Sequence, residues 1–327
     1  MNTNLNNQPP EFYIDGILQN NIAILSRAIT LVESTNTAHQ KLAQQIIEGV
    51  ISKSGNSFRL GITGVPGVGK STFIESFGKE LIANGHKLAV LAIDPSSSKS
   101  KGSILGDKTR MEELSTLPNV FIRPSPSSGT LGGVAKATYE TILLCEAAGF
   151  NFIIIETVGV GQSETMVSKL TDFFLLLMLA GAGDELQGIK RGIMEMADAL
   201  VITKADGANI EKAKLARAEY AHALHLFPPT ESDWIPKVLT CSSTINKGIT
   251  EVYKLILEYK NFTTLNNYFF TKRKLQQFEL VKELLDSKII SHYYETHFIE
   301  KKLVALNSIE IINPFAEVEK IIKTINN

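Results

Sequence analysis

Seven short, mainly apolar runs alternate with helical patterns between residues 58 and 241, and this alternation restricts the fold more than any other feature. The runs are Phe58–Thr63, Leu88–Asp94, Val120–Ile122, Phe152–Ile155, Phe173–Ala180, Leu200–Thr203 and Val238–Cys241. Continuous apolar strands are typical of sheets covered on both faces, and strands that are joined through helices run parallel. The sequence therefore predicts an α/β fold with a mostly parallel sheet between two layers of helices.

Helical patterns flank this region on both sides. Apolar residues recur at helical spacing from Gly16 to Val50, and the polar turn Ser52–Ser57 ends that segment. Beyond about Lys260 the pattern predicts charged and amphipathic helices, and the basic stretch Thr271–Lys274 is interpreted as a solvated helix face. We therefore expect three parts: a helical N-terminal extension at residues 1–55, the α/β domain at 56–260 and a helical C-terminal arm at 261–327.

Composition and charge narrow the class of protein. The formal net charge is −1, which gives no sign of a nucleic-acid surface. The longest apolar run, Phe173–Ala180, is shorter than the roughly 20 residues of a membrane span, and the Asn-rich start of the chain shows no apolar signal core. Cys145 and Cys241 lie among apolar residues, which indicates buried thiols and no zinc site. We therefore expect a cytoplasmic protein that binds neither nucleic acid nor membrane.

The stretch Gly64–Ser71, GVPGVGKS, matches the phosphate-binding pattern Gly-x-x-x-x-Gly-Lys-Ser and follows a predicted strand. Its glycines let the backbone wrap a phosphate chain, with N–H groups and the start of the next helix directed at the anion. Lys70 is expected to reach the β- and γ-phosphates, and the Ser71 hydroxyl to bind Mg²⁺. The predicted nucleotide-binding residues of this P-loop are Gly64, Val65, Pro66, Gly67, Val68, Gly69, Lys70, Ser71 and Thr72.

Acidic residues follow two of the predicted strands. Asp94 ends one strand and opens a Ser-rich loop that also holds Asp107, while Glu156 follows the apolar run FIII. Since parallel sheets bind ligands at the carboxyl ends of their strands, these carboxylates are predicted to approach Mg²⁺ and the γ-phosphate. The alternative for Asp94 is a simple turn cap. The N–H of Gly159 is predicted to bind the γ-phosphate, and Glu156 either holds Mg²⁺ through water or positions the attacking water.

The segment Thr203–Asp206, TKAD, follows another buried strand and resembles the guanine-recognition pattern Asn-Lys-x-Asp. The Asp206 carboxylate can accept hydrogen bonds from guanine N1–H and the exocyclic amine, whereas adenine presents an acceptor at N1 and leaves the carboxylate unpaired. The Lys204 stem can pack on the face of the base, and Thr203 replaces Asn at a cost of one or two neutral hydrogen bonds. After the last strand, Ser242, Ser243 and Thr244 form a loop suited to contact the base.

A second Gly-rich loop, Ala180–Gly192, carries Asp184, Glu185 and Lys190 at the end of a strand. It is either a functional switch or a helix start with acids in its first turn, and its spacing leaves both interpretations open.

The chain strongly resembles the MeaB-like, MMAA- and ArgK-type P-loop GTPases that act as chaperones of methylmalonyl-CoA mutase. The matching runs between about residues 27 and 277 are RAITLVES, GVPGVGKST, SILGDKTRM, RPSPSSGTLGGVA, ETVGVGQSE, GDELQGIKRGI and TKRKLQQ. The resemblance implies a homodimeric GTPase that uses GTP or GDP and Mg²⁺, with residues 261–327 as the dimerisation arm. Such proteins control the loading of adenosylcobalamin into the mutase, protect it and help to expel damaged cofactor.

The resemblance also implies roles for particular residues. Lys70 matches the phosphate-binding lysine and, with Asp94 and Glu156, forms the expected catalytic set. Ser71, Asp94, Asp107 and Glu156 match the magnesium positions. A third switch, which responds to the mutase, is matched by Asp184, Glu185, Gln187 and Lys190. The chain departs from the family at Lys101-Gly102, where a Gly pair is usual, and beyond about residue 278.

Hydrolysis by the chain alone is expected to be slow. In Ras-type proteins the hydrolytic Gln directly follows the switch glycine, whereas Val160 follows Gly159 here, and no arginine finger is evident. Two alternatives remain: a nickel-delivery GTPase of related fold, which normally carries a His-rich tail or Cys-His site, and an amino-acid transport kinase or ATPase. A preference for ATP over GTP would favour the latter.

Overall fold

The computed structural model describes residues 8–94, 111–126, 131–157, 163–181, 191–306 and 313–326. The chain divides into two compact units, Met1–Lys274 and Leu275–Asn327. Among the described residues, the first unit holds a β-sheet and the second is helical.

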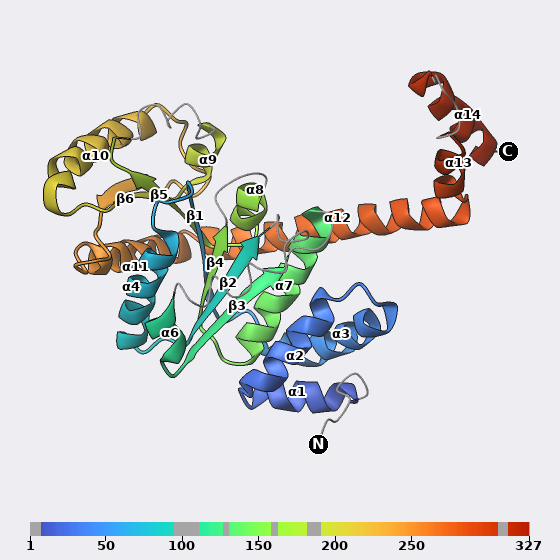
Figure 1. The fold of residues 1–327 in the computed structure, drawn as a ribbon, viewed down its shortest axis with the longest axis horizontal. Helices are drawn as coiled ribbons and strands as arrows, with labels where there is room; N and C mark the ends of the chain where they lie inside the picture. Colours follow the sequence, from blue (N-terminus) through green and yellow to red (C-terminus); the bar gives the residue numbers. More distant parts are fainter. Residues whose placement is uncertain are drawn as a thin grey trace. The chain divides into compact units, whose positions relative to one another are not determined.

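The first unit is built on a parallel sheet. Within the described residues the sheet has seven strands in the order β3-β2-β4-β1-β5-β6-β7, and every neighbouring pair is parallel (Figure 1). The predicted α/β class is thus confirmed. The strands are β1 (Phe58–Gly64), β2 (Leu88–Asp94), β3 (Val120–Pro126), β4 (Phe152–Thr157), β5 (Phe173–Leu179), β6 (Ala199–Thr203) and β7 (Lys237–Thr240).

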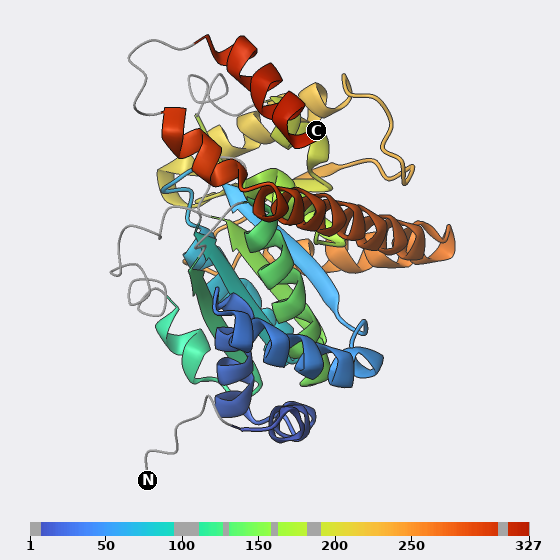
Figure 2. The ribbon, with the colours of Figure 1, turned by 90° about the vertical axis from the view of Figure 1, so that its right-hand side faces the viewer.

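Helices cover both faces of the sheet, as the continuous apolar strands predict. Alternate side chains of each strand enter different cores: Leu60 and Ile62 of β1 pack in one cluster, while Phe174 of β5 packs in the cluster on the opposite face. The first face is covered by α4 (Lys70–Ala83), α6 (Glu112–Thr116) and α11 (Ile249–Leu265). The second face is covered by α1 (Pro10–Leu18), α2 (Ile22–Glu33), α3 (Thr37–Val50), α7 (Leu131–Ala147), α8 (Ser163–Ser168), α9 (Arg191–Met196) and α10 (Ile210–Leu224) (Figure 2).

Local capping defines the N-terminal helices. The Asn21 carboxamide oxygen accepts from the N–H groups of Ala23 and Ile24, and Asn36 caps the start of α3 in the same way. Such caps satisfy backbone donors that lack a partner within the helix. Arg123 in β3 then joins α2 to the sheet through an ion pair with Glu33 at 2.6 Å. These helices share their apolar core with the sheet.

Buried charged groups form a network at the amino edge of the sheet, which is the edge opposite the P-loop. We call Arg59, Glu146, Asp172, Asp198, Lys272 and Arg273 the amino-edge network. Arg59 of β1 and Glu146 of α7 pair at 2.9 Å, with side chains only 5% and 0% exposed. Glu146 also accepts from the Gly55 N–H and from the Ser57 hydroxyl, both at 2.6 Å. Both oxygens of the buried Glu146 carboxylate therefore accept hydrogen bonds, which offsets the cost of its burial.

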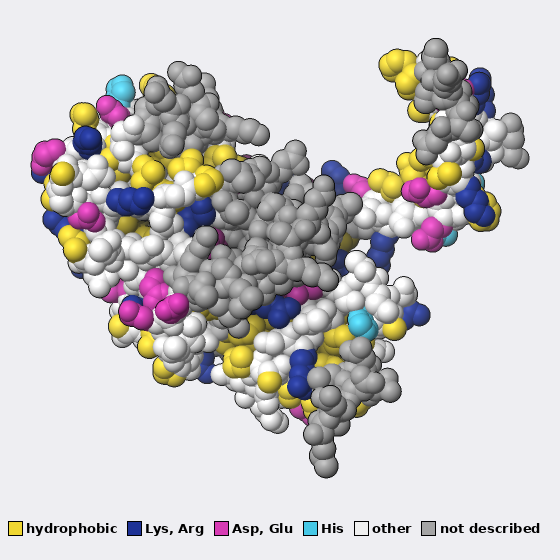
Figure 3. Space-filling view, in the orientation of Figure 1, with side chains coloured by type: hydrophobic (Ala, Val, Ile, Leu, Met, Phe, Trp, Pro, Cys, Tyr) yellow, Lys and Arg dark blue, Asp and Glu magenta, His cyan; other side chains and the backbone are white. Residues whose placement is uncertain are grey.

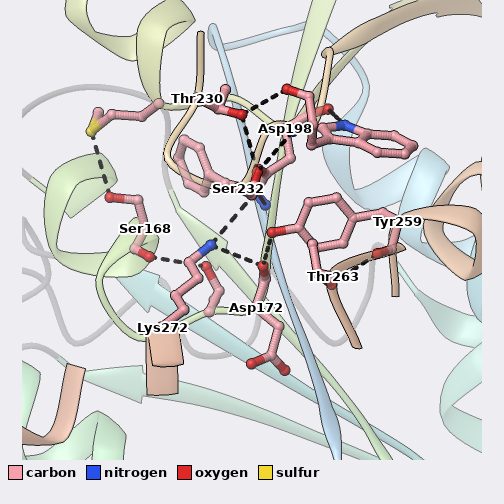
Figure 4. Close-up of polar contacts among 12 residues, drawn as sticks. Ser168, Asp172, Asp198, Thr230, Ser232, Tyr259, Thr263 and Lys272 are labelled. Carbon is pink, nitrogen blue, oxygen red and sulfur yellow. Dashed lines mark hydrogen bonds and ion pairs between the residues drawn. The ribbon is translucent and has the colours of Figure 1, made fainter. Parts of the chain in front are cut away.

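Asp172, immediately before β5, extends the network to helix α12 (Tyr268–Thr296). Its carboxylate accepts from the Arg59 N–H at 2.7 Å and from two nitrogens of Arg273 at 2.7 and 2.8 Å. Lys272 donates to the Asp172 carbonyl at 2.9 Å and lies 3.8 Å from the Asp198 carboxylate, as Figure 4 shows. The interpretation of Thr271–Lys274 as a solvated helix face is thus wrong for Lys272 and Arg273, while Thr271 and Lys274 are exposed.

The second unit contains the remainder of α12, followed by α13 (Ile299–Leu306) and α14 (Pro314–Asn326). Apolar residues of α12 recur every three or four positions, and each is at least 50% exposed: Leu275, Phe278, Val281, Leu285 and Ile289. In the part of the chain that the structure describes, no helix has the length and hydropathy needed to cross a membrane.

Both cysteines are free and buried, as the sequence predicts. Burial raises the pKa of the Cys241 thiol to about 12, so this residue is a protonated, apolar core group at neutral pH.

The amino-edge network gives a stability prediction. Arg273→Met keeps the aliphatic stem but leaves the Asp172 carboxylate, with a side chain 1% exposed, without that cation. Removing one partner of a buried pair should lower the free energy of unfolding by about 3 kcal/mol, measured by chemical denaturation. The neighbouring exposed side chain supplies a matched control, because Lys274→Met should change that free energy by less than about 0.5 kcal/mol. Equal effects of the two substitutions would contradict this account.

Candidate functional site

The predicted phosphate and guanine motifs lie at the carboxyl edge of the sheet. The P-loop follows β1, which lies between β4 and β5, while TKAD follows β6 and the Ser242 loop follows β7. Parallel strands bring these segments to one edge even though nearly 180 positions separate the first from the last in sequence.

The P-loop has a backbone that only glycine accommodates at its first position. Gly64 has φ of +154°, and a Cβ there would lie 2.5 Å from the carbonyl oxygen of Leu177 in β5. Gly69, at φ +96°, precedes the first turn of α4, where its carbonyl accepts from Phe73 at 2.8 Å. The loop therefore passes tightly against β5 before α4 begins.

Lys70 lies inside the loop and not in solvent. Its side-chain nitrogen donates to the carbonyls of Gly64 at 2.7 Å and Val65 at 3.3 Å, and the residue is 9% exposed. Ser71 is half-buried and Thr72 exposed on the same turn. The ammonium is thus held where the loop turns, which is the position required for a group that contacts phosphate oxygens.

Glu156 supplies a buried carboxylate beside this loop. It is 8% exposed and lies opposite Ile62 of β1 and Ala92 of β2 in the parallel register. The next residue, Thr157, donates from its hydroxyl to that of Thr63 at 2.8 Å, so the ends of β4 and β1 are joined next to Gly64. Asp94 ends β2, beside β4.

Several predicted site residues lie outside the described part of the chain. These are Asp107, Gly159, Asp184, Glu185, Gln187 and Lys190, together with the side chain of Asp94. Their roles stay predictions.

TKAD contacts the P-loop directly. The Thr203 hydroxyl donates to the carbonyl of Val68 at 2.7 Å and lies 3.2 Å from that of Met178. The Lys204 ammonium donates to the carbonyl of Gly67 at 2.8 Å. Two consecutive side chains of the predicted base-recognition motif therefore hold two carbonyls of the predicted phosphate loop.

Asp206 is joined to the Ser242 loop. The Ser242 hydroxyl donates to the Asp206 carboxylate, and the Ala205 N–H donates to the Cys241 carbonyl at 3.0 Å. Ser242 is buried, Ser243 is half-buried and Thr244 is exposed. The carboxylate thus has a fixed orientation beside a loop of small polar residues.

Three further residues join the segments of the candidate site through contacts that the sequence motifs did not reveal. Ser76 on α4 donates to the Ser243 carbonyl at 3.0 Å and so joins the P-loop helix to the base-side loop. Thr63 and Thr157 form the hydroxyl pair between β1 and β4. Thr157 lies within the run ETVGVGQSE, but its pairing with Thr63 and the contact of Ser76 appear only in the tertiary arrangement.

The chain is similar to known proteins over most of its length. A GTPase ArgK of Escherichia coli is 47% identical over 272 residues, which cover 83% of this chain and 82% of that protein. The Mus musculus protein named methylmalonic aciduria type A homolog, mitochondrial, is 47% identical over 292 residues, which cover 86% of this chain and 70% of that protein. A crystal structure of a LAO/AO transport system kinase is 36% identical, has a TM-score of 0.76 and covers 97% of this chain and 98% of that one.

A family model supplies the assignment. The model described as methylmalonyl Co-A mutase-associated GTPase MeaB matches residues 25–297, which include the whole sheet and every predicted site residue. This protein belongs to the MeaB family of P-loop GTPases, because the family model matches most of the chain and relatives share nearly half of its residues over most of its length.

Proposed function

We propose that this protein is a Mg²⁺-dependent GTPase that acts as a G-protein chaperone of an adenosylcobalamin-dependent acyl-CoA mutase, with methylmalonyl-CoA mutase as the first candidate. The observation that carries the nucleotide part is the contact between TKAD and the P-loop, in which Thr203 and Lys204 bind the carbonyls of Val68 and Gly67. The mutase part rests on the family, whose description names that enzyme.

The phosphates would bind along Gly64–Thr72 and the base beside Asp206. Backbone N–H groups and the start of α4 supply the positive end for the phosphate chain, and Lys70 adds a cation within the loop. Asp206 would accept from guanine N1–H and the exocyclic amine, with Ser242 holding the carboxylate and Ser243 and Thr244 beside the base. Adenine would offer that carboxylate no donor at N1.

The chemistry of the predicted metal-binding residues fits a magnesium ion. Ser71, Asp94, Asp107 and Glu156 would hold it, directly or through water, and all four offer the hard oxygen donors that Mg²⁺ prefers. Among the described members of this set, Glu156 supplies a carboxylate that is buried beside β1. The ion, when bound, neutralises charge on the β- and γ-phosphates.

Hydrolysis would depend on positioning and on charge. Lys70 would stabilise the charge that develops on the γ-phosphoryl oxygens, and Glu156 would either position the attacking water or bind the magnesium shell. Val160 stands where Ras-type proteins carry their hydrolytic Gln, so we expect slow turnover alone and acceleration by the partner. Loops around Asp94, Glu156 and Asp184 would differ between the GTP and GDP states, and the mutase would bind according to that difference.

We further propose a cytoplasmic homodimer, with residues 1–55 as the helical extension, 56–260 as the GTPase domain and 261–327 as the dimerisation arm. The exposed apolar stripe of α12 supports the last of these, because a second copy would bury it. Figure 3 shows hydrophobic side chains at the surface of this C-terminal unit.

A transport-associated kinase or ATPase is the second candidate. One observation favours it: a crystal structure with the same fold over 97% of this chain bears the name LAO/AO transport system kinase. Nucleotide preference separates the two candidates, since the proposed role of the Asp206 carboxylate requires guanine.

The first prediction concerns the base. Asp206→Asn removes the charged acceptor that Ser242 holds. GTP affinity should therefore fall roughly tenfold to hundredfold, which corresponds to the loss of one or two hydrogen bonds to a charged group. Xanthosine triphosphate carries an oxygen in place of the exocyclic amine, so it should bind the Asp206→Asn variant more tightly than it binds the wild type. Equilibrium binding of both nucleotides checks this. Unchanged GTP affinity would exclude Asp206 as the guanine contact.

The second prediction concerns the link between base motif and P-loop. Thr203→Val keeps the shape of the side chain but removes the hydroxyl that donates to the Val68 carbonyl. The affinity for GDP should therefore fall about fivefold to tenfold. Thr203→Ser retains the donor and serves as the matched control, with affinity within about twofold of wild type. A valine variant that binds GDP like the serine variant would show that this link does not shape the site.

The third prediction tests the proposed partner. Addition of stoichiometric methylmalonyl-CoA mutase should raise the GTP turnover rate at least about tenfold, because the partner supplies groups that the chain lacks. The Lys70→Ala chain, which cannot use the P-loop lysine, should show no such acceleration. The chaperone role is wrong if two results are both negative for this mutase and for every other adenosylcobalamin-dependent acyl-CoA mutase. These results are that the mutase does not accelerate hydrolysis, and that the chain does not retain the mutase in the presence of GDP or of a non-hydrolysable GTP analogue.

A further inference from the structure

The backbone of TKAD is strained at its lysine. Lys204 has φ of +55°, in the left-handed region. That conformation costs a residue with a side chain roughly 1–2 kcal/mol, and it persists only where neighbouring contacts hold it. Gly207, at φ +50°, carries no such cost. Lys204 therefore needs contacts that fix its peptide unit.

Asn209 provides those contacts. Its side-chain amide donates to the Lys204 carbonyl at 2.9 Å, and its backbone N–H donates to the Asp206 carbonyl, also at 2.9 Å. The 3₁₀ turn Gly207–Asn209 brings the residue back over the loop. One half-buried residue thus binds the backbone at both functional positions of the motif.

The direction of the Asp206 carboxylate depends on this backbone. The carboxylate has a fixed partner on one side, the Ser242 hydroxyl, and the Ala205 N–H is bound to the Cys241 carbonyl at 3.0 Å. Two parallel hydrogen bonds to a base require the carboxylate in the plane of that base, within about half an ångström. If Lys204 relaxed to negative φ, the peptide that leads to Asp206 would rotate and the carboxylate would leave that plane.

On the basis of the proposed function, we infer that Asn209 is a positioning residue for guanine recognition, which acts through the backbone of Lys204 and Asp206. Both hydrogen bonds that it donates end on carbonyls of the base motif and neither ends on the P-loop, so we expect its loss to affect binding of the base more than binding of the phosphates. An Asn that served only as a turn cap would affect stability and leave nucleotide selectivity unchanged.

The test compares GDP and ADP, which share their phosphates and differ in the base. In full-length Asn209→Ala the GDP affinity should fall about fivefold while the ADP affinity stays within about twofold, so the GDP:ADP ratio falls. Asn209→Asp, of equal size, places a carboxylate oxygen against the Lys204 carbonyl and should lower the ratio at least as far. Equilibrium binding and the thermal midpoint are measured for each variant.

Asn84→Ala is the matched control. Asn84 is also an Asn whose side-chain amide donates to a backbone carbonyl, that of Glu80 at 2.8 Å, but it lies at the far end of α4 from the P-loop. It should leave the GDP:ADP ratio unchanged. A lowered thermal midpoint with an unchanged ratio in both Asn209 variants would overturn the inference and leave the proposed function intact. A wild-type chain that binds ADP as tightly as GDP would overturn the proposed function, and this inference with it.

Discussion

The burial of Arg59 and Glu146 at the start of the central strand is the constraint on which the rest of the site depends. Both charges are almost fully withdrawn from water, and such a pair is stable only when its remaining hydrogen-bonding groups are satisfied. The Gly55 N–H and the Ser57 hydroxyl both donate to Glu146, and the Asp172 carboxylate accepts from the backbone N–H of Arg59. Arg273 binds all three of these residues, through the carbonyls of Gly55 and Ser57 and the carboxylate of Asp172. The network therefore fixes where β1 begins, both against α7 and against the first turns of α12.

The position of the start of β1 also determines the position of its carboxyl end, from which the P-loop begins. β1 is buried along its whole length and is paired on both sides, so its carboxyl end cannot shift independently of β4 and β5. At Gly64 the neighbouring β5 leaves no room for a Cβ, and Thr63 is bound to Thr157. The P-loop consequently starts from a rigid base, which a backbone cradle for phosphates requires.

The sequence predicted the sheet and the edge at which the motifs lie because both follow from local rules. Apolar runs separated by helical patterns dictate a parallel sheet, and motifs that follow parallel strands lie at its carboxyl edge. The amino-edge network was not predictable in this way. Lys272 and Arg273 lie in a charged helix whose pattern suits a solvated face, and their partner Asp172 is about one hundred positions away. Such pairs depend on tertiary geometry, as do the contacts of Ser76 and Asn209.

The same geometry explains why threonine can stand where guanine-binding proteins usually carry asparagine. The contact that the first TKAD residue makes in this fold is to the P-loop carbonyl of Val68, and one hydroxyl donor is sufficient for it. The roles within the motif are thus divided among its members and their supports. Thr203 and Lys204 bind the P-loop, Asp206 is joined to Ser242, and Asn209 holds the backbone of the motif. A substitution at the first position would therefore alter how the loops are joined, and under the proposed function the choice of base would stay with the carboxylate.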